Sequence, residues 1–124
     1  MSSQINSKKI LELFLSHLVG IKTFHFVTKK YSRHKSSDDY YTKFSDTFDQ
    51  FMEVMQGKYG RIDKSKLAID GSIVSDDNIL VSLEKFKKVL MYLTKLFPND
   101  GDLLTIRDEM MINLNQFIYL IDFN

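Results

Sequence analysis

Apolar residues recur every three to four positions in four separate stretches of this chain, and this periodicity restricts its fold more than any other feature. Such spacing places apolar side chains on one face of an α-helix, and each face must be covered by another element. In chain order, the stretches carry Ile10, Phe14, Leu18 and Ile21; Tyr41, Phe44, Phe48, Phe51 and Met55; Ile79, Leu83, Phe86, Leu90, Leu93 and Phe97; and Leu103, Met110, Leu114, Phe117 and Ile121. The pattern predicts an all-α protein with four helices.

Local signals predict where the helices begin and end. The expected helices cover about residues 7–28, 36–60, 75–97 and 103–121. Ser7 is expected to cap the first helix, and Ser36 or Ser37 the second, where two Asp residues follow and suit the positive end of the helix dipole. Pro98 ends the third helix because it cannot donate a helical hydrogen bond.

The lengths of the connections predict how the helices are joined. A polar, irregular segment of about residues 60–75 separates the second helix from the third, whereas the short turn PNDGD joins the third to the fourth. Two helical hairpins linked by one longer crossover are typical of a four-helix bundle. The 124 residues allow a single domain, residues 1–124, with enough apolar surface for one core.

The composition excludes several classes of protein. With 17 Lys and Arg against 16 Asp and Glu, the net charge of +1 argues against a globally basic nucleic-acid coat and against an acidic disordered tail. The chain contains no Cys, which excludes disulfides, thiolate metal sites and cysteine nucleophiles. The polar N-terminus and the short apolar runs predict neither a secretory signal nor a membrane span, so we expect an intracellular protein without a membrane partner.

Residue usage gives a hint about origin. Lys, Ile, Asn, Phe and Tyr supply 47 of the 124 residues, a bias that an AT-rich coding sequence produces, as in many large DNA viruses, some phages and some microbes. For a viral protein, the expected location is the host cytoplasm or the virion.

Four residues of the first expected hairpin form the pattern with the most chemical information. His34 precedes Asp49 by 15 residues and Glu53 by 19. The two acids are four positions apart, so they lie one above the other on a single helix face. Together with imidazoles such as those of His25 and His34, two stacked carboxylates are a donor set that Fe(II), Mn(II) or Zn(II) can use.

The run FHFVTKKYSRH, the fifteen-residue step to Asp49 and the Asp-x-x-x-Glu pair resemble the starvation-induced, DNA-protecting mini-ferritins (Dps-like proteins). In that family a His on the first helix, a second His near the start of the second helix and the two acids bind iron between two subunits of a hollow shell. The resemblance covers about residues 14–60 and implies a ferritin-like bundle that forms homo-oligomers. It also implies iron or another divalent metal on His25, His34, Asp49 and Glu53, with weak ferroxidase-like activity.

The chain departs from the mini-ferritin pattern in two places. The two candidate ligands His25 and His34 are only nine positions apart, and Phe26 stands where that family usually has Trp. The HKSSxxYY-like start and the EVMQGKYG-like end of the second helix are also similar to ferritin-like proteins of phages and large DNA viruses.

Other interpretations of the same residues stay open. Asp49 and Glu53 point about 120° to 160° away from the apolar face of their helix, which fits an ordinary surface pair or a site between subunits. His25 lies close to the apolar face of the first helix, where a hydrogen-bonded core histidine is the simpler interpretation. His34 falls in the expected turn, where it can cap the second helix instead of binding a metal.

A di-iron centre inside one bundle is not expected. Such a centre needs inward carboxylates from all four helices, two of them in Glu-x-x-His pairs. Glu53 is followed at the third position by Gln56, and Asp108 and Glu109 lie off the apolar face of the last helix. Two functions remain: a self-associating bundle with an iron-type site between subunits, or a metal-free structural or interaction protein, such as a minor capsid or core component of a virion.

Charge is segregated along the first half of the chain. Residues 13–37 contain five bases and no acid, whereas residues 38–53 contain five acids and one Lys. This polarity can orient self-association, or the bases can attract phosphates in a weak, salt-sensitive contact. Lys29, Lys30 and Arg33 are the candidate contacts for non-specific DNA, and a solvated hairpin tip is the simpler alternative.

Overall fold

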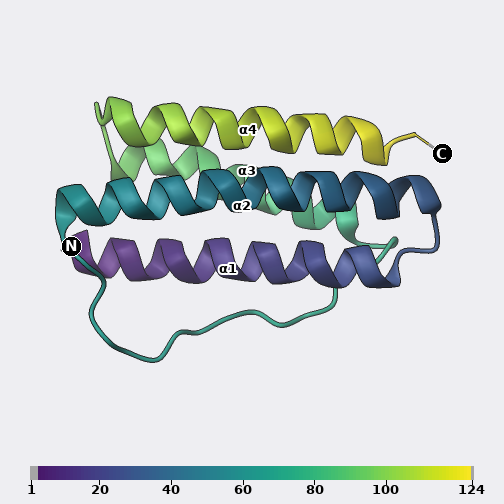
Figure 1. Ribbon diagram of the computed structural model, residues 1–124, viewed down its shortest axis with the longest axis horizontal. Coiled ribbons are helices and arrows are strands. Elements are labelled where there is room, and N and C mark those ends of the chain that lie inside the picture. The colour runs from purple at the N-terminus through teal and green to yellow at the C-terminus, as the bar shows by residue number, and fades with distance from the viewer. Residues whose placement is uncertain (1–2, 124) are drawn as a thin grey trace.

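The computed structural model describes residues 3–123 and contains four helices, with no strand in that range. They are α1 (Ser3–Val27), α2 (Tyr31–Tyr59), α3 (Ile79–Leu96) and α4 (Gly101–Ile121) (Figure 1). The predicted all-α, four-helix bundle with a longer connection between its second and third helices is confirmed.

The helices lie side by side along the long axis of the molecule (Figure 1). Short turns join α1 to α2 and α3 to α4, whereas residues 60–78 run back along α1 before α3 begins. We call this segment the crossover. Because it returns the chain to the end where α2 begins, α2 and α3 run in the same direction, and α1 and α4 run opposite to both. The α1–α2 and α2–α4 interfaces are the most extensive, and the α1–α3 interface is the least.

Two helix starts differ from the predicted ones because of Asp76. Its carboxylate accepts hydrogen bonds from the backbone N–H of Lys29 (2.9 Å) and from the hydroxyl of Thr28 (2.7 Å). These bonds fix the α1–α2 turn, so α2 begins at Tyr31 and not at Ser36 or Ser37. Since Asp76 is engaged there, it does not cap the third helix, and α3 begins at 79 instead of 75.

Two further boundaries also shift. α1 begins at Ser3, so Ser7 lies inside the helix and does not cap it. α4 begins at Gly101, two residues earlier than expected, because the Asp100 carboxylate accepts a hydrogen bond from the backbone N–H of Leu103 (3.3 Å). A side chain in this position satisfies one of the backbone donors that a helix N-terminus leaves without a partner.

Aromatic rings from several helices fill the core. Phe14 of α1 is fully buried and lies edge-to-face against four other rings, with centroid distances of 5.3–5.8 Å. Those four rings are Phe44, Phe48, Phe51 and Phe86. Edge-to-face packing is the arrangement that the charge distribution of aromatic rings favours. These rings join α1, α2 and α3 through one aromatic cluster.

A polar network fixes each end of the bundle. At one end, the buried guanidinium of Arg33 donates to Asp76 (3.0 Å) and to the carbonyl oxygen of Ile121 (3.1 Å), joining α2, the crossover and α4. At the other end, Lys58 and Tyr59 of α2 both donate to Asp100, which caps α4. Both networks link segments that are distant in the sequence.

The crossover is held against α1 by hydrogen bonds and by one close approach. The backbone N–H of Asp70 donates to the Ser16 hydroxyl (2.9 Å), and that of Val74 donates to the Thr23 hydroxyl (3.2 Å). A Cβ atom at Gly20 would lie only 3.1 Å from the Val74 side chain. The absence of a side chain at this position lets the crossover lie close to the helix.

One stretch of α1, Ser7–Val27, is long and apolar enough, by length and composition alone, to cross a membrane. The prediction of no membrane span rested on the shortness of the uninterrupted apolar runs, whereas this stretch is apolar on average over its length. In the bundle, Phe14 and Phe24 of the same stretch are fully buried against other helices. Core helices share this composition.

Candidate functional site

His25 and His34 lie against each other where α1 ends and α2 begins. Their rings are stacked, with centroids 4.0 Å apart and planes 18° apart. The Nδ1 atom of His25 is 2.9 Å from the carbonyl oxygen of His34, and the Nδ1 atom of His34 is 2.9 Å from the carbonyl oxygen of His25. A carbonyl oxygen only accepts, so both Nδ1 atoms donate. In the neutral rings, each Nε2 atom then carries a free lone pair, and because the rings are stacked, one ring must rotate before both lone pairs can reach a single ion.

The position of His34 corrects the prediction that placed it in a turn. His34 lies in the first turn of α2, where its backbone N–H donates to the carbonyl oxygen of Lys30 (3.0 Å). Its ring is exposed, and the ring of His25 is half-buried. His25 is thus hydrogen-bonded, as its simpler interpretation expects, yet it lies beside the second candidate ligand.

Asp49 and Glu53 are exposed on the later half of α2. Neither carboxylate forms a hydrogen bond or an ion pair with the described residues 7–123. Asp49 lies 15 residues after His34 on one straight helix, which corresponds to about 22 Å. The two halves of the candidate ligand set are therefore too far apart to hold one ion within one chain.

The other described acids and histidines of one chain do not complete a metal site either. Among the described residues, no group of three or more His, Asp or Glu side chains is placed to hold a metal ion. The candidate ligands nevertheless share one side of α2. At 100° per residue, Asp49 is rotated about 60° from His34, and Glu53 about 100°. A second molecule that packs along this side can reach all three.

The candidate DNA contacts separate into two groups. Lys29 and Lys30 are exposed at the α1–α2 turn. Arg33 is 6% exposed, and its guanidinium is engaged with Asp76 and α4, so it is not available to a phosphate backbone. Two exposed aromatic rings, Phe26 and Tyr31, lie at the same end of the bundle.

His17, which the sequence motifs did not include, lies three residues after Phe14 on the apolar face of α1. Its ring is stacked on Phe86 at 3.6 Å, and its Nε2 atom is 2.7 Å from the hydroxyl oxygen of Tyr40. Burial lowers the pKa of His17 to about 3, and burial also raises the pKa of Tyr40. His17 is therefore neutral at physiological pH. Its place on an apolar stripe was the signal in the sequence for a buried histidine.

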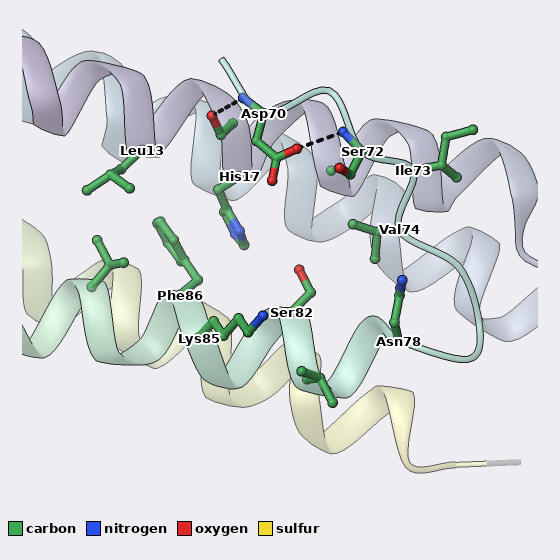
Figure 2. A pocket seen from close by; sticks show the side chains of 14 residues that line it. Leu13, His17, Asp70, Ser72, Ile73, Val74, Asn78, Ser82, Lys85 and Phe86 are labelled. Carbon is green, nitrogen blue, oxygen red and sulfur yellow. Dashed lines mark hydrogen bonds between the residues drawn. The ribbon is translucent and has the colours of Figure 1, made fainter. Parts of the chain in front are cut away.

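His17 also lines a cleft of about 370 Å³ between α1, α3 and the crossover (Figure 2). Asp70 of the crossover and Ser82 and Lys85 of α3 supply further polar groups around it. None of these residues was a candidate in the sequence, because the cleft joins segments more than 50 residues apart along the chain.

Fold and connectivity define a four-helix bundle whose two hairpins are joined by one long crossover. The chain belongs to the DUF5856 family, a family of unknown function, whose model matches residues 25–121. The matched region contains α2, α3, α4 and all four candidate metal ligands. No match is found among curated proteins or among solved structures.

Proposed function

We propose that this protein forms a two-fold dimer in which the α2 helices of two copies pair antiparallel and hold divalent metal ions between them. Each ion is bound by His25 and His34 of one copy and by Asp49 and Glu53 of the other. The observation that carries the proposal is the exposed side of α2 that His34 shares with Asp49 and Glu53, whose carboxylates have no partner among the described residues.

The spacing of these residues suits such a dimer. His34 lies eight residues before Thr42, and Asp49 and Glu53 lie seven and eleven residues after it. A two-fold axis that crosses α2 near Thr42 therefore places His34 of one copy between Asp49 and Glu53 of the other. Because a two-fold interface repeats each contact, the dimer contains two equal sites.

Charge supports the same arrangement. The basic segment, residues 13–37, includes the start of α2, and the acidic segment, residues 38–53, follows on the same helix. Lys22 lies on α1 and Arg33 is buried, so antiparallel pairing about Thr42 brings the exposed Lys35 of each copy opposite Asp49 of the other. Complementary charges of this kind orient partners and speed their association.

The donor chemistry suits iron, manganese or zinc. Imidazole and carboxylate ligands are common to these metals. The carbonyl oxygens that accept from both Nδ1–H groups supply the outer contacts that orient a ligating histidine. The single long crossover, a connectivity shared with ferritin-like bundles, and the mini-ferritin resemblance favour iron and weak ferroxidase-like activity.

Metal analysis and sedimentation of protein without a histidine tag test the proposal. We expect the parent to bind about one ion per chain as a dimer. His25→Ala with His34→Ala, and separately Asp49→Ala with Glu53→Ala, should each abolish binding. A control with Glu84→Ala and Glu109→Ala, two exposed acids of α3 and α4, should bind like the parent.

A mixture of the two inactive variants distinguishes a site between chains from a site within one. Each mixed dimer keeps one complete site, with both histidines from one chain and both carboxylates from the other. Half of the dimers are mixed after random exchange of an equimolar mixture, so binding should return to about a quarter of an ion per chain. No recovery on mixing, or equal metal content in all variants, would contradict the proposal.

A second candidate function has its own supporting observation. Met91 and Tyr92 on α3 and Ile112 and Tyr119 on α4 are each more than half exposed. Large apolar side chains in this number suit a structural or interaction protein that is covered by a partner in a larger assembly, such as a virion. A metal-free monomer in the experiment above would favour this function over the metal site.

A further inference from the structure

The cleft between α1, α3 and the crossover forms a ligand-sized site that the proposed metal function does not use. Its volume of about 370 Å³ is in the range of small-molecule sites. The cleft exists because α1 and α3 pack least closely and because small residues, Ser16 and Gly20 of α1 and Ser82 of α3, line it. The crossover covers one side of it, as Figure 2 shows.

His17 supplies a fixed hydrogen-bond donor to this cleft. Its side chain is more than nine-tenths buried, and its Nε2 atom faces the buried hydroxyl of Tyr40. That hydroxyl has no other acceptor in the described part of the chain, so the O–H group donates to Nε2, since a buried donor without a partner is costly. The proton of the neutral ring then resides on Nδ1, which has no partner among the described residues, and the ring points from α1 into the cleft (Figure 2).

The α3 side of the cleft adds two more donors. The Ser82 hydroxyl and the Lys85 ammonium group lie one helical turn apart and line the cleft. Neither forms a hydrogen bond or an ion pair with another described side chain of residues 7–123. Together with the Nδ1–H group of His17, they can bind the oxygens of a small anionic group.

The crossover supplies the opposite charge. The carboxylate of Asp70 accepts a hydrogen bond from the backbone N–H of Ser72 (2.9 Å), which holds it in place and lowers its pKa, with a smaller contribution from the charge of Lys85. Asp70 and Lys85 form no ion pair with each other among the described contacts. A simple anion would face the carboxylate of Asp70, and a simple cation would face Lys85.

We propose that this cleft binds a small zwitterion, a free α-amino acid with an apolar side chain. The carboxylate of the ligand accepts hydrogen bonds from His17, Ser82 and Lys85, and its ammonium group donates to the carboxylate of Asp70. Leu13, Val81 and Val89 provide an apolar wall for the side chain.

An NMR titration of the full-length, ¹⁵N-labelled protein with leucine and with phenylalanine tests this proposal. We expect saturable amide shifts around Asp70, Ser82 and Lys85. Leucine methyl ester lacks the carboxylate and N-acetyl-leucine lacks the ammonium group, so each should bind at least about tenfold more weakly than leucine. No shift with either amino acid at millimolar concentration, or equal binding of N-acetyl-leucine, would overturn the assignment.

Two substitutions at exposed positions locate the ligand without disturbing the core. Lys85→Met and Asp70→Asn should each weaken leucine binding about tenfold. Lys88→Met, on the same helix but outside the cleft, is the matched control and should bind like the parent. Parent-like affinity of both the Lys85 and the Asp70 variants would place any binding elsewhere.

Discussion

At the scale of single residues, His17 shows how burial changes the chemistry of a side chain. A histidine in water titrates near neutral pH, whereas the ring of His17 lies between Phe86 and the Tyr40 hydroxyl with little access to solvent. Protonating this ring would place a charge in the aromatic core without a carboxylate to compensate it. The folded protein therefore resists binding a proton that the unfolded chain accepts readily.

Because of this difference, we expect acid to destabilise the fold at pH values well above those at which carboxylates titrate. The pKa of His17 is about 3 in the folded protein and about 6.5 in an unfolded chain. Above about pH 6.5, the neutral ring makes its full contribution to the free energy of unfolding. This contribution is lost as the pH falls from there toward 3, by up to about 1.4 kcal/mol per pH unit. Urea unfolding at pH 7.5 and pH 5 should thus show a loss of about 2 kcal/mol.

Two variants separate His17 from the other histidines. His17→Gln should lower stability at pH 7.5 but reduce the loss between pH 7.5 and pH 5. His34→Ala, at an exposed position, should retain that loss. An unchanged loss in the His17→Gln variant would show that another group causes the pH dependence.

At the scale of the elements, the end of α2 depends on a backbone conformation that side chains disfavour. Gly60 has a φ of 98°, and its backbone N–H donates to the carbonyl oxygen of Gln56 (2.9 Å) at the end of the helix. Glycine adopts positive φ without the steric cost that a Cβ atom adds. Three residues earlier, Gly57 lies inside the helix, where an added Cβ would meet no atom within 4 Å beyond its chain neighbours and the local helix backbone.

The two glycines should therefore respond to alanine with opposite signs. Gly60→Ala should lower the free energy of unfolding by about 1 kcal/mol or more, because the alanine must adopt positive φ. Gly57→Ala should raise it by up to about 1 kcal/mol, because alanine has the higher helix propensity. Urea titrations of both variants check this, and a stabilising Gly60→Ala would contradict the assigned end of α2.

At the scale of the whole molecule, the two polar networks fix how the helices and the crossover are joined. Burial opposes ionisation of Asp76 and of Asp100, but hydrogen bonds outweigh burial and lower the pKa of each carboxyl group. Asp76 accepts from Lys29, Thr28 and Arg33. Asp100 accepts from Lys58, Tyr59 and the backbone of Leu103. Both networks therefore persist above about pH 4 and weaken only below it. Arg33 has the widest reach, because its guanidinium holds the crossover and the end of α4 at once.

Replacing Arg33 should consequently destabilise the whole bundle. Arg33→Met leaves Asp76 without its buried cation and the Ile121 carbonyl without a donor, which should cost about 2–4 kcal/mol in urea unfolding. Lys30→Met, at an exposed position nearby, should change stability by less than about 0.5 kcal/mol. A cost for Arg33→Met as small as that of the control would mean that its contacts do not stabilise the fold.

The fold class, the number of helices and most of the core could be predicted from the amino-acid sequence, because apolar periodicity is a local property. Phe44, Phe48, Phe51 and Met55 recur at helical spacing, and all four are buried. The same local geometry also predicted that Asp49 and Glu53 lie exposed on one helix face.

The roles of residues whose partners are distant in the chain could not be predicted from local patterns and depend on how the segments pack. Arg33, a candidate DNA contact in the sequence, is buried because Asp76 and Ile121 lie beside it, 43 and 88 residues later. The Asp76 carboxylate also fixes the turn that starts α2 early and places His34 beside His25. Tertiary structure likewise created the His17 cleft, since no local pattern records which segment of a crossover will lie over which helix.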